Sequence, residues 1–232
     1  MKGNKPTNIA FIPVRGGSKS IPLKNIHPLC GKPLVYWTVK AACECERIDK
    51  VYVSTDSEQI RCTVEAFGFK KVTVVDRSAE TASDTASTES AMLEFAQRHD
   101  FAHVVLIQAT SPLLTAEDLN HGFVVYDRPD CDSVFSAVRR YQFLWTDDEK
   151  GTAKPMNYDI FHRPRRQEYN GYLIENGAFY ITSKERLLLT KNRFSGKIMP
   201  SEMGGNTTFE IDEPEDWTIV EAVMRKIGIA EQ

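Results

Sequence analysis

Short apolar runs alternate with longer amphipathic stretches along most of this chain. The runs predict buried strands at Asn8 to Val14, Lys50 to Ser54, Val72 to Val75, His103 to Ile107, Ser133 to Val138 and Glu175 to Ile181. Helices are predicted between the earlier strands, at Pro33 to about Cys45, Ser57 to about Phe67, Ser87 to about Arg98 and Thr115 to about Tyr126. Strands separated by helices of about ten residues indicate βαβ units. The pattern therefore predicts an α/β fold whose sheet is mostly parallel, with helices on both faces.

Capping residues mark where several of these helices begin. Ser57 is placed to cap the second helix, and Thr115 with Asp118 has the spacing of a capping box. Ser183 is placed to cap a further short helix. Toward the end of the chain, residues 207–212 predict a late strand. Pro214 then begins a last helix, whose apolar residues are Trp217, Val220, Val223 and Ile227.

The regular alternation stops after Val138. Residues 139–172 are polar and basic, with scattered aromatic residues, before the next strand is predicted. A segment that long inside a compact domain is usually a functional excursion, such as a lid or a dimer arm. No linker or repeat divides the remainder, so we expect one domain over residues 1–232 with residues 139–172 as its excursion.

Composition and charge remove several classes of protein. The 232 residues include 29 Lys and Arg against 32 Asp and Glu, a net charge of −3, so nothing favours nucleic acid as a partner. No apolar run approaches the roughly 20 residues of a membrane span, and no membrane association is expected. The five cysteines form no CxxC pair and have no histidine at zinc spacing. A reducing cytoplasm is the expected location.

The loop after the first predicted strand carries the strongest chemical signal. It begins with Arg15, Gly16 and Gly17, and adds the cations Lys19 and Lys24. Adjacent glycines let backbone N–H groups approach an anion, and the cations can neutralise a polyphosphate. The spacing matches neither GxGxxG nor GxxxxGK[ST]. The loop therefore predicts a phosphate site of another type, with a solvated turn as the alternative.

Several ordered motifs give this chain a resemblance to a known family. They are Arg15-Gly16-Gly17-Ser18-Lys19 with Ile21-Pro22-Leu23-Lys24-Asn25, Val53-Ser54-Thr55-Asp56, Ala82-Ser83-Asp84-Thr85-Ala86-Ser87, Gln108-Ala109-Thr110-Ser111-Pro112-Leu113, Asp132-Ser133-Val134-Phe135-Ser136, Arg163-Pro164-Arg165-Arg166-Gln167 and Glu175-Asn176-Gly177-Ala178-Phe179-Tyr180. Together they resemble the acylneuraminate cytidylyltransferases, also called CMP-sialic acid synthetases. Residues 141–145 and the Arg163 motif resemble the animal-type enzymes in particular. The resemblance implies a Rossmann-like nucleotidyltransferase sheet.

The resemblance also implies a reaction and a nucleotide site. CTP and a nonulosonic (sialic) acid give the CMP-sugar and pyrophosphate, as the anomeric hydroxyl attacks the α-phosphate. Arg15 and Lys24 are implied as catalytic residues that hold the triphosphate. The remaining nucleotide-binding positions are Gly16, Gly17, Ser18, Lys19, Asn25, Arg77, Ala86, Ser87 and Thr88. The loop at 77–88 also has a structural interpretation, in which Ser87 only caps the next helix.

The acceptor sugar carries a carboxylate group, and the resemblance implies cationic and amide side chains that bind the sugar. Gln108 and Tyr180 are expected to contact the sugar, together with Arg163 and Arg165 from the excursion. In the family, the excursion forms a dimer contact and reaches into the partner's active site. We therefore expect a homodimer in which Arg163 or Arg165 acts across the interface. A solvated cluster of charges is the alternative interpretation of these arginines.

Two carboxylates near the end of the chain predict a metal site. Glu210 and Asp212 alternate along the predicted strand at 207–212, so both are expected on one face, where they would bind Mg²⁺ or Mn²⁺. The family usually has Asp in the first place, so Asp212 is the better-supported ligand. Asp212 is also a candidate to accept the proton of the anomeric hydroxyl. Alternatively, it only caps the helix that begins at Pro214.

Two other functions remain compatible with these motifs. One is a cytidylyltransferase for an eight-carbon keto acid, a CMP-3-deoxy-manno-octulosonate synthetase. The other is a non-catalytic sensor of sugar nucleotides, which would bind CTP without turnover. The joint presence of Arg15, Lys24, Gln108 and Asp212 favours an enzyme over a sensor.

Overall fold

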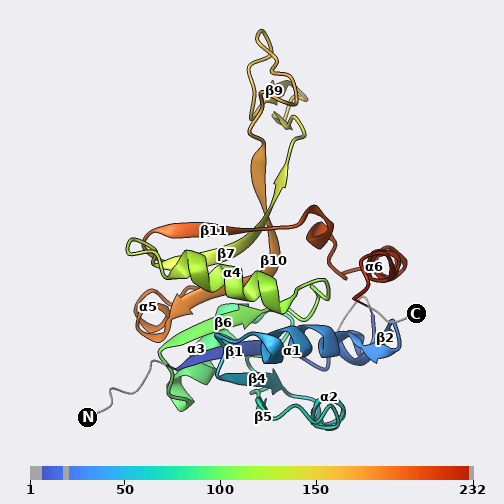
Figure 1. The fold of residues 1–232 in the computed structure, drawn as a ribbon, viewed down its shortest axis with the longest axis vertical. Coiled ribbons are helices and arrows are strands. Elements are labelled where there is room, and N and C mark those ends of the chain that lie inside the picture. Colours follow the sequence, from blue (N-terminus) through green and yellow to red (C-terminus); the bar gives the residue numbers. More distant parts are fainter. Residues whose placement is uncertain (1–6, 18–20, 230–232) are drawn as a thin grey trace.

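The computed structural model describes residues 7–17 and 21–229, and a seven-stranded sheet lies at its centre (Figure 1). The strand order is β11-β7-β10-β6-β1-β4-β5. The strands are β1 (Asn8–Pro13), β4 (Lys50–Thr55), β5 (Val72–Asp76), β6 (His103–Ile107), β7 (Ser133–Arg140), β10 (Tyr172–Ser183) and β11 (Ile198–Met203). β10 is antiparallel to both its neighbours, and every other pair in this sheet is parallel. The prediction of a mostly parallel sheet is confirmed.

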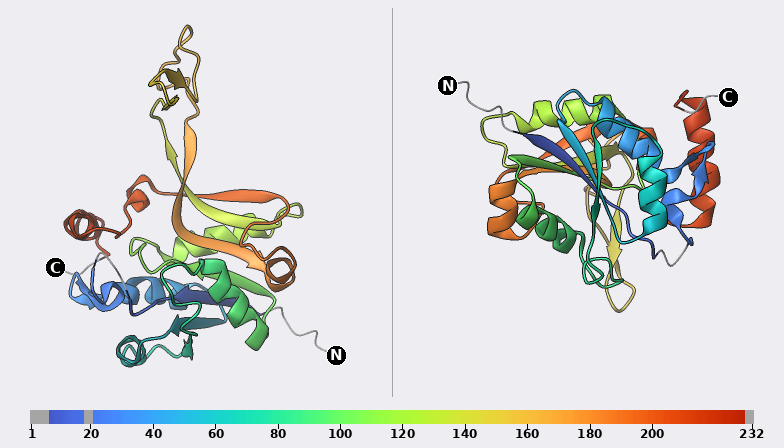
Figure 2. Two further views of the ribbon diagram at one scale, coloured as in Figure 1. Left: turned by 180° about the vertical axis from the view of Figure 1, so that it is seen from behind. Right: turned by 90° about the horizontal axis from the view of Figure 1, so that it is seen from below.

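Helices cover both faces of the sheet, as the right view of Figure 2 shows. One core cluster packs α1 (Leu34–Glu44), α2 (Glu58–Glu65) and α4 (Ala116–Tyr126) on one face. A second packs α3 (Thr88–Arg98) and α5 (Lys184–Thr190) on the other. β1 contributes to both clusters, because Ala10 and Ile12 face one side while Ile9 and Phe11 face the other. That alternation explains why the sequence of β1 is an unbroken apolar run.

Local capping chemistry sets the helix starts that the sequence predicts. The Ser57 hydroxyl accepts a hydrogen bond from the Ile60 N–H, and the Ser183 hydroxyl accepts one from the Arg186 N–H. At α4, Thr115 and Asp118 form both bonds of a capping box. These bonds satisfy N–H groups that have no partner inside the helix.

The predicted late strand at 207–212 is wrong. Residues Gly205–Thr208 form a 3-10 helix, η2, and residues 209–213 are irregular. Thr207 is buried, its hydroxyl donates to the Gly204 carbonyl, and Asn176 of β10 donates to Thr207. These side-chain bonds hold a turn where the sequence suggests a strand. The last strand of the sheet is β11, which contains Pro200 and lies at the sheet edge, where a proline is tolerated.

A third apolar cluster joins the first loop of the chain to its last helix. It contains Leu29 of the short strand β2 (Pro28–Leu29), which pairs with β3 (Lys32–Pro33), and Val220 and Met224 of α6 (Pro214–Lys226). Ile211 is fully buried in the same cluster, and its N–H donates to the Thr110 carbonyl at 2.9 Å. The cluster therefore anchors the segment that carries Glu210 and Asp212 beside the first loop.

Between β7 and β10 the chain leaves the sheet and forms an arm, residues 141–171, which stands away from the body in Figure 1. The arm contains the short antiparallel pair β8 (Trp145–Asp147) and β9 (Ala153–Pro155). Phe143 packs against Tyr158 and Tyr169 at ring-centroid distances of 4.3 and 5.3 Å. The dimer contact expected of this segment stays a prediction.

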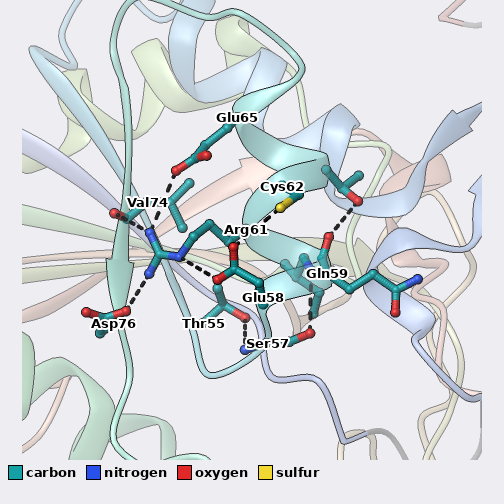
Figure 3. A network of polar contacts seen from close by, with 11 residues as sticks. Thr55, Ser57, Glu58, Gln59, Arg61, Cys62, Glu65, Val74 and Asp76 are labelled. Carbon is teal, nitrogen blue, oxygen red and sulfur yellow. Dashed lines mark hydrogen bonds and ion pairs between the residues drawn. The ribbon is translucent and has the colours of Figure 1, made fainter.

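The sheet edge opposite β11 is formed by β5, and a side chain from α2 contacts it. Figure 3 shows Arg61 reaching across to β5, where its guanidinium donates to the Val74 carbonyl at 3.3 Å and contacts Asp76. A further short 3-10 helix, η1, spans Lys24–Ile26. Among the helices in residues 7–17 and 21–229, none combines the length and apolar composition needed to cross a bilayer.

Candidate functional site

A cavity of about 300 Å³ opens at the carboxyl ends of β1 and β6. The chain runs outward from β1 to β4 and β5, and then returns to β6 on the other side of β1. The strand order therefore reverses between β1 and β6, and open α/β sheets bind ligands at such a point. The residues lining the cavity are Pro13, Arg15, Gly17, Lys24, Asn25, Arg77, Ser83, Asp84, Ala86, Thr88, Gln108, Ala109 and Thr110.

The loop after β1 is held in shape by contacts with neighbouring segments. The Gly16 N–H donates to Asp56 Oδ1 at 2.8 Å, and the buried Asn25 donates to the Arg15 carbonyl at 3.2 Å. A Cβ at Gly16 would lie 2.9 Å from Ser57 Cβ, so only glycine fits this approach. Ser18 and Lys19, predicted from the sequence to bind nucleotide, lie outside the described residues.

Lys24 connects this loop to the segment that precedes α6. Its Nζ donates to the Ile211 carbonyl at 2.8 Å and lies 3.3 Å from Asp212 Oδ1. The side chain is only 12% exposed, so its charge is fixed in place rather than solvated. Arg15, on the other side, pairs with Asp84 at 2.8 Å between Nη1 and Oδ1. Both predicted triphosphate-binding cations therefore line the cavity.

A third cation, Arg77, enters the cavity from the loop after β5. Arg77 donates through Nη2 to the Thr81 carbonyl, while its buried Nε has no hydrogen-bond partner among the described residues. Burial lowers the pKa of Arg77, and the nearby Arg15 adds to that effect, whereas Asp56 and Glu94 oppose it. A partly desolvated guanidinium with a spare donor favours an anionic or carbonyl-bearing ligand.

The remaining predicted nucleotide positions divide between the cavity and the helix start. Ala86 and Thr88 line the cavity. The Ser87 hydroxyl accepts the Ser90 N–H at 3.1 Å and caps α3, and Ser87 is not among the lining residues. The structural interpretation of Ser87 is therefore the one that its side-chain contacts support.

Gln108 lies at the end of β6 and lines the cavity, as the sequence predicts. Its own N–H donates to the Ala178 carbonyl at 3.2 Å. Tyr180, the other predicted sugar contact, is only 3% exposed and packs in the second core cluster. Its hydroxyl donates to Glu175, and burial, with that carboxylate, raises the pKa of Tyr180. Tyr180 does not line this cavity.

The predicted metal-binding carboxylates lie together although their segment is not a strand. Burial raises the pKa of Glu210 to about 7, with the charges of Asp212 and Glu175 adding to the effect and Lys24 opposing it. A Cβ at Gly177, in the β10 bulge, would lie 3.1 Å from both Glu210 carboxylate oxygens. Carboxylates crowded in this way attract a cation, and Mg²⁺ binds one or two carboxylates plus phosphate oxygens.

The donor set therefore fits Mg²⁺ shared with a phosphate ligand, not a metal held by protein alone. Within the part of the chain that the structure describes, His, Cys, Asp and Glu side chains form no group of three able to hold an ion.

The predicted arginines of the arm lie apart from this cavity in the same chain. Arg163 stacks over Phe143 at 4.6 Å, and the Arg165 N–H donates to Glu168 Oε2 at 3.3 Å. Both side chains are exposed on the arm. A role for them in the cavity would require a second copy of the chain.

Three polar residues that line the cavity have no predicted binding role. Ser83, Asp84 and Thr110 all contribute to its wall. Each lies inside a motif that carries the family resemblance, so the signal was available in the sequence. Asp84 has the most direct connection, because its carboxylate pairs with Arg15.

Comparisons with known proteins agree with this geometry. The profile of a family described as "Cytidylyltransferase" matches residues 9–150. N-acylneuraminate cytidylyltransferase A of Danio rerio is 40% identical over 223 residues, which is 94% of this chain and 51% of that protein. N-acylneuraminate cytidylyltransferase of Oncorhynchus mykiss is 37% identical over 97% of this chain and 52% of its own length. The chain thus spans about half the length of these curated relatives.

A solved structure extends the likeness to the fold. CMP:2-keto-3-deoxy-manno-octonic acid synthetase, complexed with CTP, superimposes with a TM-score of 0.68 over 95% of this chain and 99% of that one. At 18% sequence identity, the match shows a common fold alone. The comparisons confirm the family resemblance, and its closeness to the animal enzymes, that the motifs indicate.

Proposed function

The chain belongs to the cytidylyltransferase family, and from that premise we propose that it joins CTP to a nonulosonic (sialic) acid, releasing pyrophosphate. The relatives named N-acylneuraminate cytidylyltransferase support this acceptor class. The single observation that carries the proposal is the cavity itself. It brings Arg15, Lys24 and Arg77 together with Gln108 at the point where the sheet reverses its strand order.

The residues of the cavity suit a transfer at the α-phosphate of CTP. The anomeric oxygen forms a bond to the α-phosphorus, the bond to the bridging oxygen of the β-phosphate breaks, and pyrophosphate leaves. Such reactions are accelerated mainly by positioning and by neutralising phosphate charge. Arg15 and Lys24 are fixed in the cavity wall and would neutralise the triphosphate without reorganising.

Two further parts of the site complete the proposal. Asp212 and the partly buried Glu210 would hold Mg²⁺ or Mn²⁺, which would supply additional neutralisation of phosphate charge. Asp212 is exposed beside Lys24 and would also accept the proton that the anomeric hydroxyl releases. Gln108 would bind the sugar, since an amide donates to a carboxylate and accepts from a hydroxyl at once.

We further propose a homodimer in which the arm of one copy brings Arg163 and Arg165 to the sugar carboxylate in the other. Both arginines are exposed and lie outside the cavity of their own chain, which supports a role in a second copy. The five cysteines are all unpaired, which supports a location in a reducing compartment such as the cytoplasm.

Pyrophosphate release with CTP, Mg²⁺ and a panel of acceptors tests the proposal. The panel contains N-acetylneuraminate, its deaminated analogue, a legionaminate and the eight-carbon keto acid. We expect release with a nonulosonate, loss of activity in EDTA, and a loss of at least 100-fold in Asp212→Ala, because a phosphate-neutralising centre is removed. Asp100→Ala is the matched control. Asp100 lies before the amino end of β6, whereas the cavity lies at the carboxyl ends of the strands, and its side chain is exposed.

Each other outcome points to a different function. Release with the eight-carbon keto acid alone would indicate the octulosonate enzyme. CTP binding without turnover on any acceptor would indicate a sensor and would contradict the catalytic proposal.

A further inference from the structure

We propose that Glu94 of α3 is a positioning residue for CTP, because it fixes the loop at residues 77–88 that carries one wall of the cavity. This inference rests on the proposed function. Glu94 does not line the cavity and acts through residues that connect to it. Nothing in the sequence motifs singles it out.

One carboxylate oxygen of Glu94 collects several donors from this loop. Glu94 Oε2 accepts hydrogen bonds from the Thr81 hydroxyl at 2.6 Å, from the Ser78 hydroxyl at 3.0 Å and from the Ser78 N–H at 3.4 Å. The Glu94 side chain is only 14% exposed, so these bonds compete little with water. Hydrogen bonds to a charged acceptor are about twice as strong as neutral ones.

The ionised form of Glu94 is favoured in this setting. Burial alone would raise the pKa of Glu94, but the hydrogen bonds from Thr81 and Ser78, with the charge of Arg98, outweigh it and lower the pKa. The carboxylate therefore remains a charged acceptor at neutral pH.

Thr81 passes this constraint on to the cavity. Its carbonyl accepts the hydrogen bond from Arg77 Nη2, and Arg77 lines the cavity. The Ala82 N–H then donates to the Ser78 carbonyl at 3.0 Å, which closes the turn before Ser83 reaches the cavity wall. Glu94 thus fixes the position of Thr81, whose carbonyl orients the Arg77 side chain.

Glu94 also balances the charge of Arg77. The carboxylate is one of two negative groups, with Asp56, that raise the pKa of Arg77 against burial. A rigid anchor is available for this role, because Met92 and Phe95 on either side of Glu94 are buried in the second core cluster. Because α3 is fixed in the core, the Glu94 carboxylate is held at a fixed position beside the loop at residues 77–88.

Direct binding of CTP to the purified chain, measured by calorimetry, tests the inference. We expect Glu94→Ala to weaken CTP binding about tenfold, which corresponds to the loss of a hydrogen bond to a charged group. Thr81→Val, which removes only the hydroxyl, is expected to weaken binding in the same direction. The double variant should bind no more weakly than Glu94→Ala alone, because both substitutions break one connection.

Matched controls separate positioning from general damage. Arg98 pairs with the other Glu94 oxygen, Oε1, at 3.0 Å and is 60% exposed, so Arg98→Ala should leave CTP binding within twofold of wild type. In the Glu94 and Thr81 variants, the binding stoichiometry, kcat at saturating CTP and the KM for the acceptor should stay unchanged. A merely structural defect would instead lower the stoichiometry and kcat.

The outcomes decide between the two proposals. An affinity for CTP equal to that of the wild type in both Glu94→Ala and Thr81→Val would overturn the positioning role and leave the proposed function intact. Absence of CTP binding by the wild-type chain would overturn both. Should Glu94→Ala fail to fold, Thr81→Val still decides the question, because valine keeps the shape of the side chain and removes only the hydroxyl that donates to Glu94.

Discussion

At the scale of single residues, each cation of the cavity is already held by protein groups. Lys24 is bound to a main-chain carbonyl and near Asp212, Arg15 is paired with Asp84, and Arg77 is bound to the Thr81 carbonyl. Charges fixed in this way need little reorganisation when an anion enters, which favours transition-state stabilisation over simple attraction. The same crowding places Glu210 in an environment unfavourable to its negative charge.

Glu210 therefore predicts a pH dependence of stability. Its pKa is raised from 4.5 to about 7, so the folded chain binds one more proton than the unfolded chain between those values. The stabilising contribution is fully present below pH 4.5 and is lost as the pH rises through 7. Glu210→Gln should remove this loss. At pH 8 we expect the variant to be more stable than wild type by about 1–2 kcal/mol, after allowing for the partial exposure of Glu210.

Urea unfolding at pH 4.5 and pH 8, with and without Mg²⁺, measures this effect. At pH 4.5 the two proteins should unfold alike, and at pH 8 Mg²⁺ should stabilise the wild type more than Glu210→Gln. Glu149→Gln, in the exposed turn between β8 and β9, is the control. A constant difference between wild type and Glu210→Gln at both pH values would contradict the prediction.

At the scale of elements, the antiparallel strand β10 carries much of the architecture. Its register shifts between Glu175 and Tyr180, and Gly177 within that bulge has a φ of +67°. The bulge brings the backbone against the Glu210 carboxylate. Further along β10, Phe179 packs directly on α4, where Gly122 leaves room for its ring. The helix and the strand approach closely because position 122 has no side chain.

Gly122→Ala should therefore destabilise the protein. A Cβ at position 122 would lie 2.5 Å from Phe179 Cε2 and 2.8 Å from its Cζ. The gain in helix propensity is about 1 kcal/mol, and overpacking of a core typically costs more. We expect a net loss of about 1–2 kcal/mol in the free energy of unfolding, measured in urea. Val124→Ala on the same helix, at a side chain 61% exposed, should change stability little. An equal or higher stability of Gly122→Ala would show that the ring moves aside freely.

At the scale of the whole molecule, the arm exposes large hydrophobic side chains of a kind that is usually buried. Phe161 is 84% exposed, Met156 62% and Trp145 50%, and all three lie on the arm. Figure 2 shows the arm from behind, standing clear of the sheet and its helices. Exposed apolar groups gathered on one projection are typical of an interaction site, which supports the proposed dimer.

The proposed dimer predicts complementation between two inactive variants. Asp212→Ala lacks the carboxylate beside Lys24 of the cavity, and Arg165→Ala lacks an arm residue. If the arm acts in the partner's cavity, a mixed dimer contains one intact site, so mixing the variants should restore up to about a quarter of wild-type activity. The measurement is pyrophosphate release after mixing and re-equilibration.

Sedimentation provides the companion measurement. Wild type should sediment as a dimer, and Phe161→Glu should shift the population toward monomer, because a charge would be buried in the interface. Lys154→Glu, an exposed polar position on the same arm, tests whether charge reversal alone has this effect. A fully active wild-type monomer would contradict the role of the arm across two copies.

Local sequence determined most of the elements in this protein. Apolar runs predicted β1, β4, β5, β6 and β7, and short-range hydrogen bonds at Ser57 and Thr115 set helix starts, because both signals act within a few residues. No apolar run predicted the parallel edge strand β11. The glycines and cations of the first loop likewise pointed to an anion site, since their chemistry does not depend on distant partners.

Only the tertiary structure decided how distant segments meet. The segment at 207–212 alternates like a strand, yet Asn176 and the third apolar cluster hold it as a turn and loop. Tyr180 is predicted to contact the sugar, but strand alternation and core packing direct its side chain into the second core cluster. Glu94 carried no signal in the sequence, because its role depends on Thr81, 13 positions away, and exists only when α3 packs beside the loop. Long-range packing selects such partners, and no local pattern encodes it.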